Sequence, residues 1–120
     1  MNLITSTILN SLFLAAHLTL SHGLLKWVSL QKSDTHLGLM IEYWWVYVSD
    51  IGVYGFIFFY YAYILKSTSI NLLYPTYTGL SIISVFLMGV LIFNEPVTVK
   101  QIIGCIFIFV GIYFMIGIDF

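Results

Sequence analysis

The chain has 120 residues, of which 61% are hydrophobic and only 8% are charged. A soluble domain of this length could not hide so much apolar surface, because small proteins bury a limited share of their surface and soluble surfaces are rich in charge. The formal net charge of −1 excludes the basic stripe of a nucleic-acid-binding protein. These numbers favour an integral membrane protein, because lipid tails can surround an apolar exterior.

Four segments are long and apolar enough to span a bilayer, which takes about 20 residues. They predict an all-α membrane protein, in which residues 1–120 form one domain, a compact bundle of four transmembrane helices. The expected helices cover residues 3–28, 41–65, 70–93 and 99–118. The first segment has no positive region before it and no clear small-residue cleavage site, so we expect a retained helix rather than a signal peptide.

The second segment allows two interpretations. One is a long tilted helix over residues 41–65. The other lays residues 38–48, which are rich in Trp and Tyr, along the membrane interface, where these residues concentrate. The span then starts at Ser49-Asp50, a plausible pair of N-capping residues. We favour the long helix. The two interpretations differ in whether Asp50 lies near the middle of the membrane or at the start of a helix.

Three stretches near the C-terminus form a recognisable series: NLLYPTYTG (71–79), FNEPV (93–97) and IIGCIFIFVGI (102–112). They resemble, in this order, the start of the third helix, the acidic-proline turn and the final helix of the small four-helix members of the drug/metabolite transporter superfamily. The resemblance implies a transporter that acts as a dimer, either of two identical chains or with a similar small subunit. It also implies a multi-pass protein of the bacterial inner membrane.

Two branches of that superfamily are candidates. Small multidrug resistance exporters carry a glutamate in the first helix, but residues 15–21 contain no acid, and the nearest polar residue there is His17. EamA-like small proteins, which include the aminoarabinose-lipid flippase subunits, also lack that glutamate. Their turn before the last helix is similar to NEPVT (94–98). The chain therefore resembles the EamA-like branch more closely.

Asp50 is the first candidate for a functional residue. A charge within the bilayer costs several kcal/mol, so it seldom faces lipid. Asp50 could bind a proton or cation, or a polar group of a substrate; alternatively, it could cap a helix or bond to a neighbouring helix. Glu42 is expected nearer the interface, as a solvated boundary charge.

The first segment contributes three further candidates for substrate binding. His17 and His22 are five residues apart, about 140° around a helix, which argues against a shared metal site. His22 and Lys26 are four apart and share a face. They could bind an anionic headgroup together, or they could simply mark the end of the helix.

The third and fourth segments add aromatic and small residues. By resemblance, Tyr74, Tyr77 and Thr78 line the substrate cavity; alternatively, the tyrosines belong to an interfacial aromatic belt. Gly104 and Gly111 lie seven residues apart and so fall on nearly one helix face. Small residues let helices approach closely in lipid. The resemblance implies that this face forms the dimer contact, and the alternative is packing within one bundle.

No catalytic triad, metal cluster, phosphate loop or redox motif occurs in the sequence, so we expect neither an enzyme nor a metal or cofactor. The leading hypothesis is a transporter that flips or exports an amphipathic, lipid-linked or phosphate-bearing substrate by alternating access, with membrane lipid as its surroundings. One alternative is an exporter of small cations or multiple drugs. Another is a non-transporting accessory subunit of a membrane complex.

Overall fold

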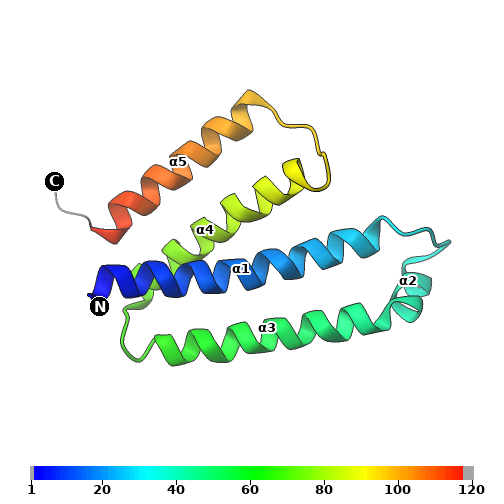
Figure 1. Cartoon of the computed structure of the whole chain (residues 1–120), viewed down its shortest axis with the longest axis horizontal. Helices are drawn as coiled ribbons and strands as arrows, with labels where there is room; N and C mark the ends of the chain where they lie inside the picture. Colours follow the sequence, from blue (N-terminus) through cyan, green and yellow to red (C-terminus); the bar gives the residue numbers. More distant parts are fainter. Residues whose placement is uncertain (1, 118–120) are drawn as a thin grey trace.

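All regular structure in residues 2–117, the part of the chain that the computed structural model describes, is helical (Figure 1). This confirms the predicted all-α class. The five helices of this range are α1 (Leu3–Ser29), α2 (His36–Glu42), α3 (Trp44–Ile64), α4 (Ile70–Leu91) and α5 (Val99–Ile116).

Three of these helices, α1, α4 and α5, are long and apolar enough to cross a membrane. They fit the membrane protein that the composition predicts. α3 is also long, with 21 residues, but it is rich in Trp and Tyr, carries Asp50, and is not among the three. The structure therefore supports three spanning helices, and the expected fourth would have to be α3.

The helix ends follow from local side-chain chemistry. The Asn2 side chain caps α1 by accepting a hydrogen bond from the backbone N–H of Thr5 at 2.7 Å. Thr98 and Gln101 form a capping box at the start of α5, with reciprocal bonds of 3.2 and 2.9 Å. After α4, Asn94 takes a left-handed conformation with φ of 54°, which asparagine tolerates better than most residues. The chain can therefore turn sharply between α4 and α5.

The predicted long helix over residues 41–65 is wrong at its start. The backbone breaks at Tyr43, whose φ of −108° and ψ of 33° are not helical, so α2 is a separate short helix. The alternative N-cap at Ser49-Asp50 is wrong as well, because Tyr43 is the residue that precedes α3. Asp50 lies six residues after Trp44, about 9 Å along a helix of about 31 Å. It is thus inside the helix, between its start and its middle.

The helices form a flat layer instead of the expected compact bundle. Figure 1 shows the long helices side by side in the order α3, α1, α4 and α5, with α1 packed on both α3 and α4. The shortest extent of the molecule is 18 Å, against 55 and 37 Å for the others. α5 packs chiefly on α4 and contains no buried residue. In lipid an apolar helix gains little by burying its surface in protein, so an open layer is tolerated.

Small and hydroxyl-bearing residues bring the central helices together. The fully buried positions of α1 and α4 include Thr7, Ser11, Ser21 and Thr76. The Thr76 hydroxyl donates to the Leu72 carbonyl at 2.7 Å, which satisfies it within its own helix. Helices in lipid pack closely where side chains are small, so these residues set the central contact.

α5 reaches α4 at Gly79. A Cβ atom at this position would lie 2.7 Å from Cδ1 of Ile112 in α5, closer than real Cβ atoms are found. The side chain of Ile112 therefore lies over the glycine. This contact was not among those that the sequence singled out.

Candidate functional site

Asp50 is almost completely buried, with 3% of its surface exposed, between α3 and α1. Its Oδ1 accepts a hydrogen bond from the Ser21 hydroxyl of α1 at 3.0 Å. Its Oδ2 is buried and has no hydrogen-bond partner among the described residues. A buried carboxylate that is only half satisfied is costly in a membrane, so this oxygen favours a proton or a donor group from outside the chain.

His22 connects this buried acid with a groove on the surface. It follows Ser21, the hydrogen-bond partner of Asp50, and its ring lies 6.5 Å from the ring of Tyr54 in α3. His22 also lines a groove of about 390 Å³ between α1 and α4, together with Thr78 and Ser81 of α4. The rest of the lining is apolar and consists of Leu18, Ile82, Val85 and Phe86. A groove of this kind suits an apolar chain with a polar group near His22.

The predicted tyrosines form a cluster that joins α3 to α4. The rings of Tyr74 and Tyr77 lie 6.4 Å apart, and Tyr61 of α3 lies 6.4 and 6.0 Å from them. The Tyr61 hydroxyl is buried without a hydrogen-bond partner in the described chain. Neither Tyr74 nor Tyr77 lines the groove of His22, so the cluster lies beside the start of α4, outside that groove.

Lys26 has a partner that the sequence did not indicate. Its Nζ lies 3.2 Å from Oε1 of Glu95, and about half of each side chain is exposed. The pair ties the last turn of α1 to the turn between α4 and α5. Lys26 shares a helix face with His22, as predicted, but its charge is already paired with an acid.

His17 belongs to a different cluster. Its Nδ1 lies 2.8 Å from the Phe13 carbonyl, and its ring lies 4.4 Å from Phe13 and 5.3 Å from Phe56 of α3. In the same contact Tyr60 of α3 donates to Asn10 of α1 at 2.8 Å. The structure thus places His17 in the packing of α1 on α3, apart from the groove that His22 lines.

Gly104 and Gly111 face open space. A Cβ atom at either position would meet nothing within 4 Å in the described chain. Packing within one protomer does not therefore account for these glycines. Between residues 2 and 117, no group of three His, Cys, Asp or Glu side chains could hold a metal ion.

No protein-family model, curated protein or solved structure matches this chain.

The structure places His22 and Thr78 in one groove and Asp50 on the neighbouring Ser21, whereas Tyr74 and Tyr77 lie with Tyr61 and do not line that groove. The residues that the sequence missed are Ser21, Tyr54 and Tyr61. Ser21 lies 29 residues from Asp50, and only the packing of α1 on α3 pairs them. Tyr61 is one of nine tyrosines, and no sequence signal distinguishes it from the others.

Proposed function

We propose that this chain is a membrane transporter that moves an amphipathic, lipid-linked or phosphate-bearing substrate across the bilayer by alternating access. The observation that carries the proposal is Asp50, a buried acid in a long helix, one of whose carboxylate oxygens has no hydrogen-bond partner in residues 2–117. Ionisable residues kept inside a membrane despite their cost commonly mark the path of a substrate or an ion.

The substrate path follows the groove between α1 and α4. Its apolar lining receives the hydrophobic part of the substrate, and Thr78 provides a hydroxyl group in the groove, while Tyr74 and Tyr77 provide hydroxyl groups nearer the start of α4. His22 meets the polar group, and Asp50 orients it or couples its movement to a proton. Lys26 provides a positive charge for an anionic group once its ion pair with Glu95 breaks. This pair is about half exposed and therefore contributes little free energy.

Two copies are needed in this proposal. The described helices form one layer, 18 Å thick, and a layer cannot surround a substrate. A second copy, or a similar small subunit, would complete the cavity. The open glycine face of α5, with Gly104 and Gly111, provides the contact that the family resemblance implies.

A second candidate function is the export of small organic cations. The unpaired Oδ2 of Asp50 favours it, because a carboxylate attracts a cation as readily as it binds a proton. In this function Asp50 takes the place of the acid that small multidrug exporters carry in their first helix.

Reconstituted vesicles distinguish these functions. We expect the purified protein to move a fluorescent phospholipid between leaflets, and Asp50→Asn and His22→Ala each to reduce the rate about tenfold or more. Glu42→Gln, which removes an exposed acid outside the groove, serves as the matched control.

Transport that survives His22→Ala, Lys26→Ala and Asp50→Asn would contradict the proposed path. Uptake of ethidium driven by a pH gradient, without movement of lipid, would support the cation exporter instead. No transport of either probe, combined with purification in fixed ratio with a different chain, would indicate an accessory subunit.

A further inference from the structure

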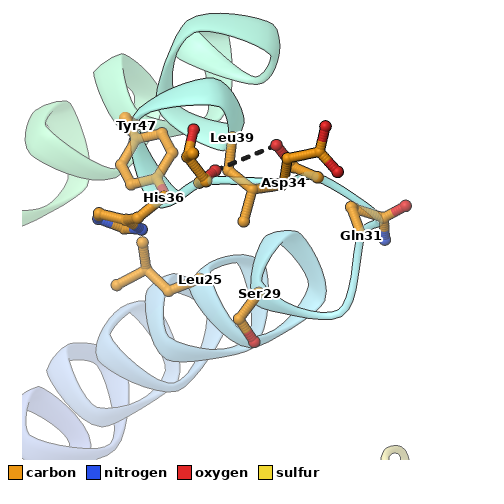
Figure 2. Close-up of a pocket in the computed structure, with 9 residues that line it drawn as sticks. Leu25, Ser29, Gln31, Asp34, His36, Leu39 and Tyr47 are labelled. Carbon is orange, nitrogen blue, oxygen red and sulfur yellow. Dashed lines mark hydrogen bonds between the residues drawn. The ribbon is translucent and has the colours of Figure 1, made fainter.

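A second pocket, whose lining shares no residue with the groove of His22, lies at the C-terminal end of α1, where the chain passes through a polar loop and α2 into α3. It has a volume of about 490 Å³. The lining residues are Leu25, Ser29, Gln31, Ser33, Asp34, Thr35, His36, Leu39 and Tyr47. Figure 2 shows His36 and Tyr47 together at one side, with Asp34 and Gln31 at the other and Leu25 and Ser29 on the α1 side.

Aromatic residues place this pocket at the level of the lipid headgroups. The ring of Trp27 lies 5.6 Å from Tyr43 and 6.4 Å from Trp45, so three interfacial residues meet beside the pocket. Trp and Tyr concentrate where the hydrocarbon ends and the headgroups begin. A pocket at this depth is open to the polar part of a phospholipid, and its volume is typical of a small-molecule site.

The serines and Asp34 of the lining leave acceptors for a ligand. The hydroxyl protons of Ser29 and Ser33 are donated to the carbonyls of Lys26 and Thr35, at 2.6 and 3.0 Å. The Gln31 amide donates to the Trp27 carbonyl at 2.9 Å. The oxygens of both serines can still accept, and so can the carboxylate of Asp34, which makes no hydrogen bond or ion pair within the described chain.

The charge of the lining also favours a ligand that carries a positive charge. Asp34 is the only Asp, Glu, Lys or Arg among the residues that line the pocket. The rings of His36 and Tyr47, 6.5 Å apart and nearly perpendicular, form an aromatic side opposite it. An aromatic face and a carboxylate both attract a cation, whereas the lining offers no lysine or arginine to an anion.

We infer that this pocket binds the primary ammonium headgroup of a phospholipid, namely phosphatidylethanolamine. An ammonium group has three donors and no acceptor, which complements the carboxylate of Asp34 and the serine oxygens of the same pocket. The hydroxyl of Tyr47 and the ring of His36 have no hydrogen bonds within the described residues, and they are available to the phosphate that follows the ammonium. The site is separate from the transport groove and depends only on the placement of the protein in a membrane.

The test is a lipid titration of the protein in dodecyl maltoside micelles, followed by native mass spectrometry. We expect phosphatidylethanolamine to bind at least about tenfold more tightly than phosphatidylcholine, whose trimethylammonium has no N–H donors. Asp34→Asn, which keeps the shape of the side chain, should abolish that difference. Tyr47→Phe should weaken the binding of phosphatidylethanolamine by about three- to tenfold.

Two matched variants serve as controls. Glu42→Gln removes an acid from α2 that does not line the pocket, and Tyr63→Phe removes a hydroxyl from the far end of α3. Both should bind like the unaltered protein. Circular dichroism and gel filtration verify that each variant is folded.

Equal binding of phosphatidylethanolamine and phosphatidylcholine would overturn the inference, as would a preference for phosphatidylglycerol. Loss of binding in Glu42→Gln as large as in Asp34→Asn would overturn the assigned site. Binding of free ethanolamine without binding of the lipid would overturn the lipid as the source of the ammonium. None of these results depends on transport, so failure of the proposed function leaves this test unaffected.

Discussion

Asp50 and Ser21 illustrate how one buried polar pair joins two helices. The serine hydroxyl donates to one carboxylate oxygen, and the other oxygen has no partner among the residues that the structure describes. A charge-assisted hydrogen bond in a site of low polarity is stronger than one in water, and its loss leaves a buried group without any partner. The hydrogen bond between Ser21 and Asp50 therefore affects both the stability of the α1–α3 contact and the ability of Asp50 to bind a proton or a ligand.

We therefore expect Ser21→Ala to destabilise the protein by about 1–3 kcal/mol, since it leaves Asp50 without its described hydrogen bond. The thermal unfolding midpoint in detergent is the measurement. Ser11→Ala is the matched control: Ser11 is also fully buried in α1, but its hydroxyl has no partner in the described chain. Its removal should be neutral or stabilising. Equal losses in the two variants would refute a special role for the Ser21 bond.

In the proposed function, the ion pair between Lys26 and Glu95 competes with a substrate for the positive charge of Lys26. Because both side chains are about half exposed, the pair contributes no more than about 1 kcal/mol. We expect Glu95→Gln to leave the unfolding midpoint nearly unchanged and to strengthen the binding of phosphatidic acid by up to about fivefold. A lipid titration by native mass spectrometry measures this. Unchanged or weaker binding would show that Lys26 does not meet the anionic group.

At the scale of the helices, glycine decides how α5 sits on α4. Gly79 admits the side chain of Ile112, whereas Gly55 in α3 has nothing within 4 Å of a Cβ atom in the described structure. The short helix α2 is a second feature of this scale. It separates the loop after α1 from α3 and contributes His36 and Leu39 to the pocket lined by Asp34.

Gly79→Val should displace Ile112 and lower the stability of the α4–α5 contact by about 1–3 kcal/mol, as overpacking does elsewhere. Gly55→Val has the same chemistry at an open position and should have little effect. Thermal unfolding measures both. Ile112→Ala combined with Gly79→Val should recover part of the loss, and the absence of any recovery would contradict the proposed contact.

For the whole molecule, the flat arrangement leaves α5 almost wholly exposed. Lipid could cover this helix entirely, so exposure alone does not require a partner. The open glycines are the positions at which a partner helix could approach most closely, and the proposed transporter needs such a partner.

We expect the purified protein to be a dimer, and the double variant Gly104→Leu, Gly111→Leu to be mainly monomeric in native mass spectra. Leucine at these positions keeps the helix apolar but prevents close approach. Gly55→Leu, a glycine at an open position on α3, should stay dimeric. A dimer that persists in the double variant would place the contact on another face.

Much of the helical structure could be predicted from the sequence. Apolar length locates α1, α4 and α5, because the thickness of a bilayer sets the length of a spanning helix. Polar loops and the Asn94-Glu95-Pro96 turn mark the ends to within a few residues. The break at Tyr43 could not be predicted, because the residues on either side of it are equally compatible with a helix.

The sequence by itself determined the helical class, and it identified Asp50 as a candidate functional residue. Both results follow from the free-energy cost of placing polar groups in lipid. Only the tertiary structure decided which residues meet. It paired Asp50 with Ser21 and Lys26 with Glu95, and it placed His17 in the contact of α1 with α3 and His22 in the groove between α1 and α4. The physical reason is that lipid imposes a length and a polarity on each helix, whereas the register and rotation of one helix against another depend on side-chain packing across the contact.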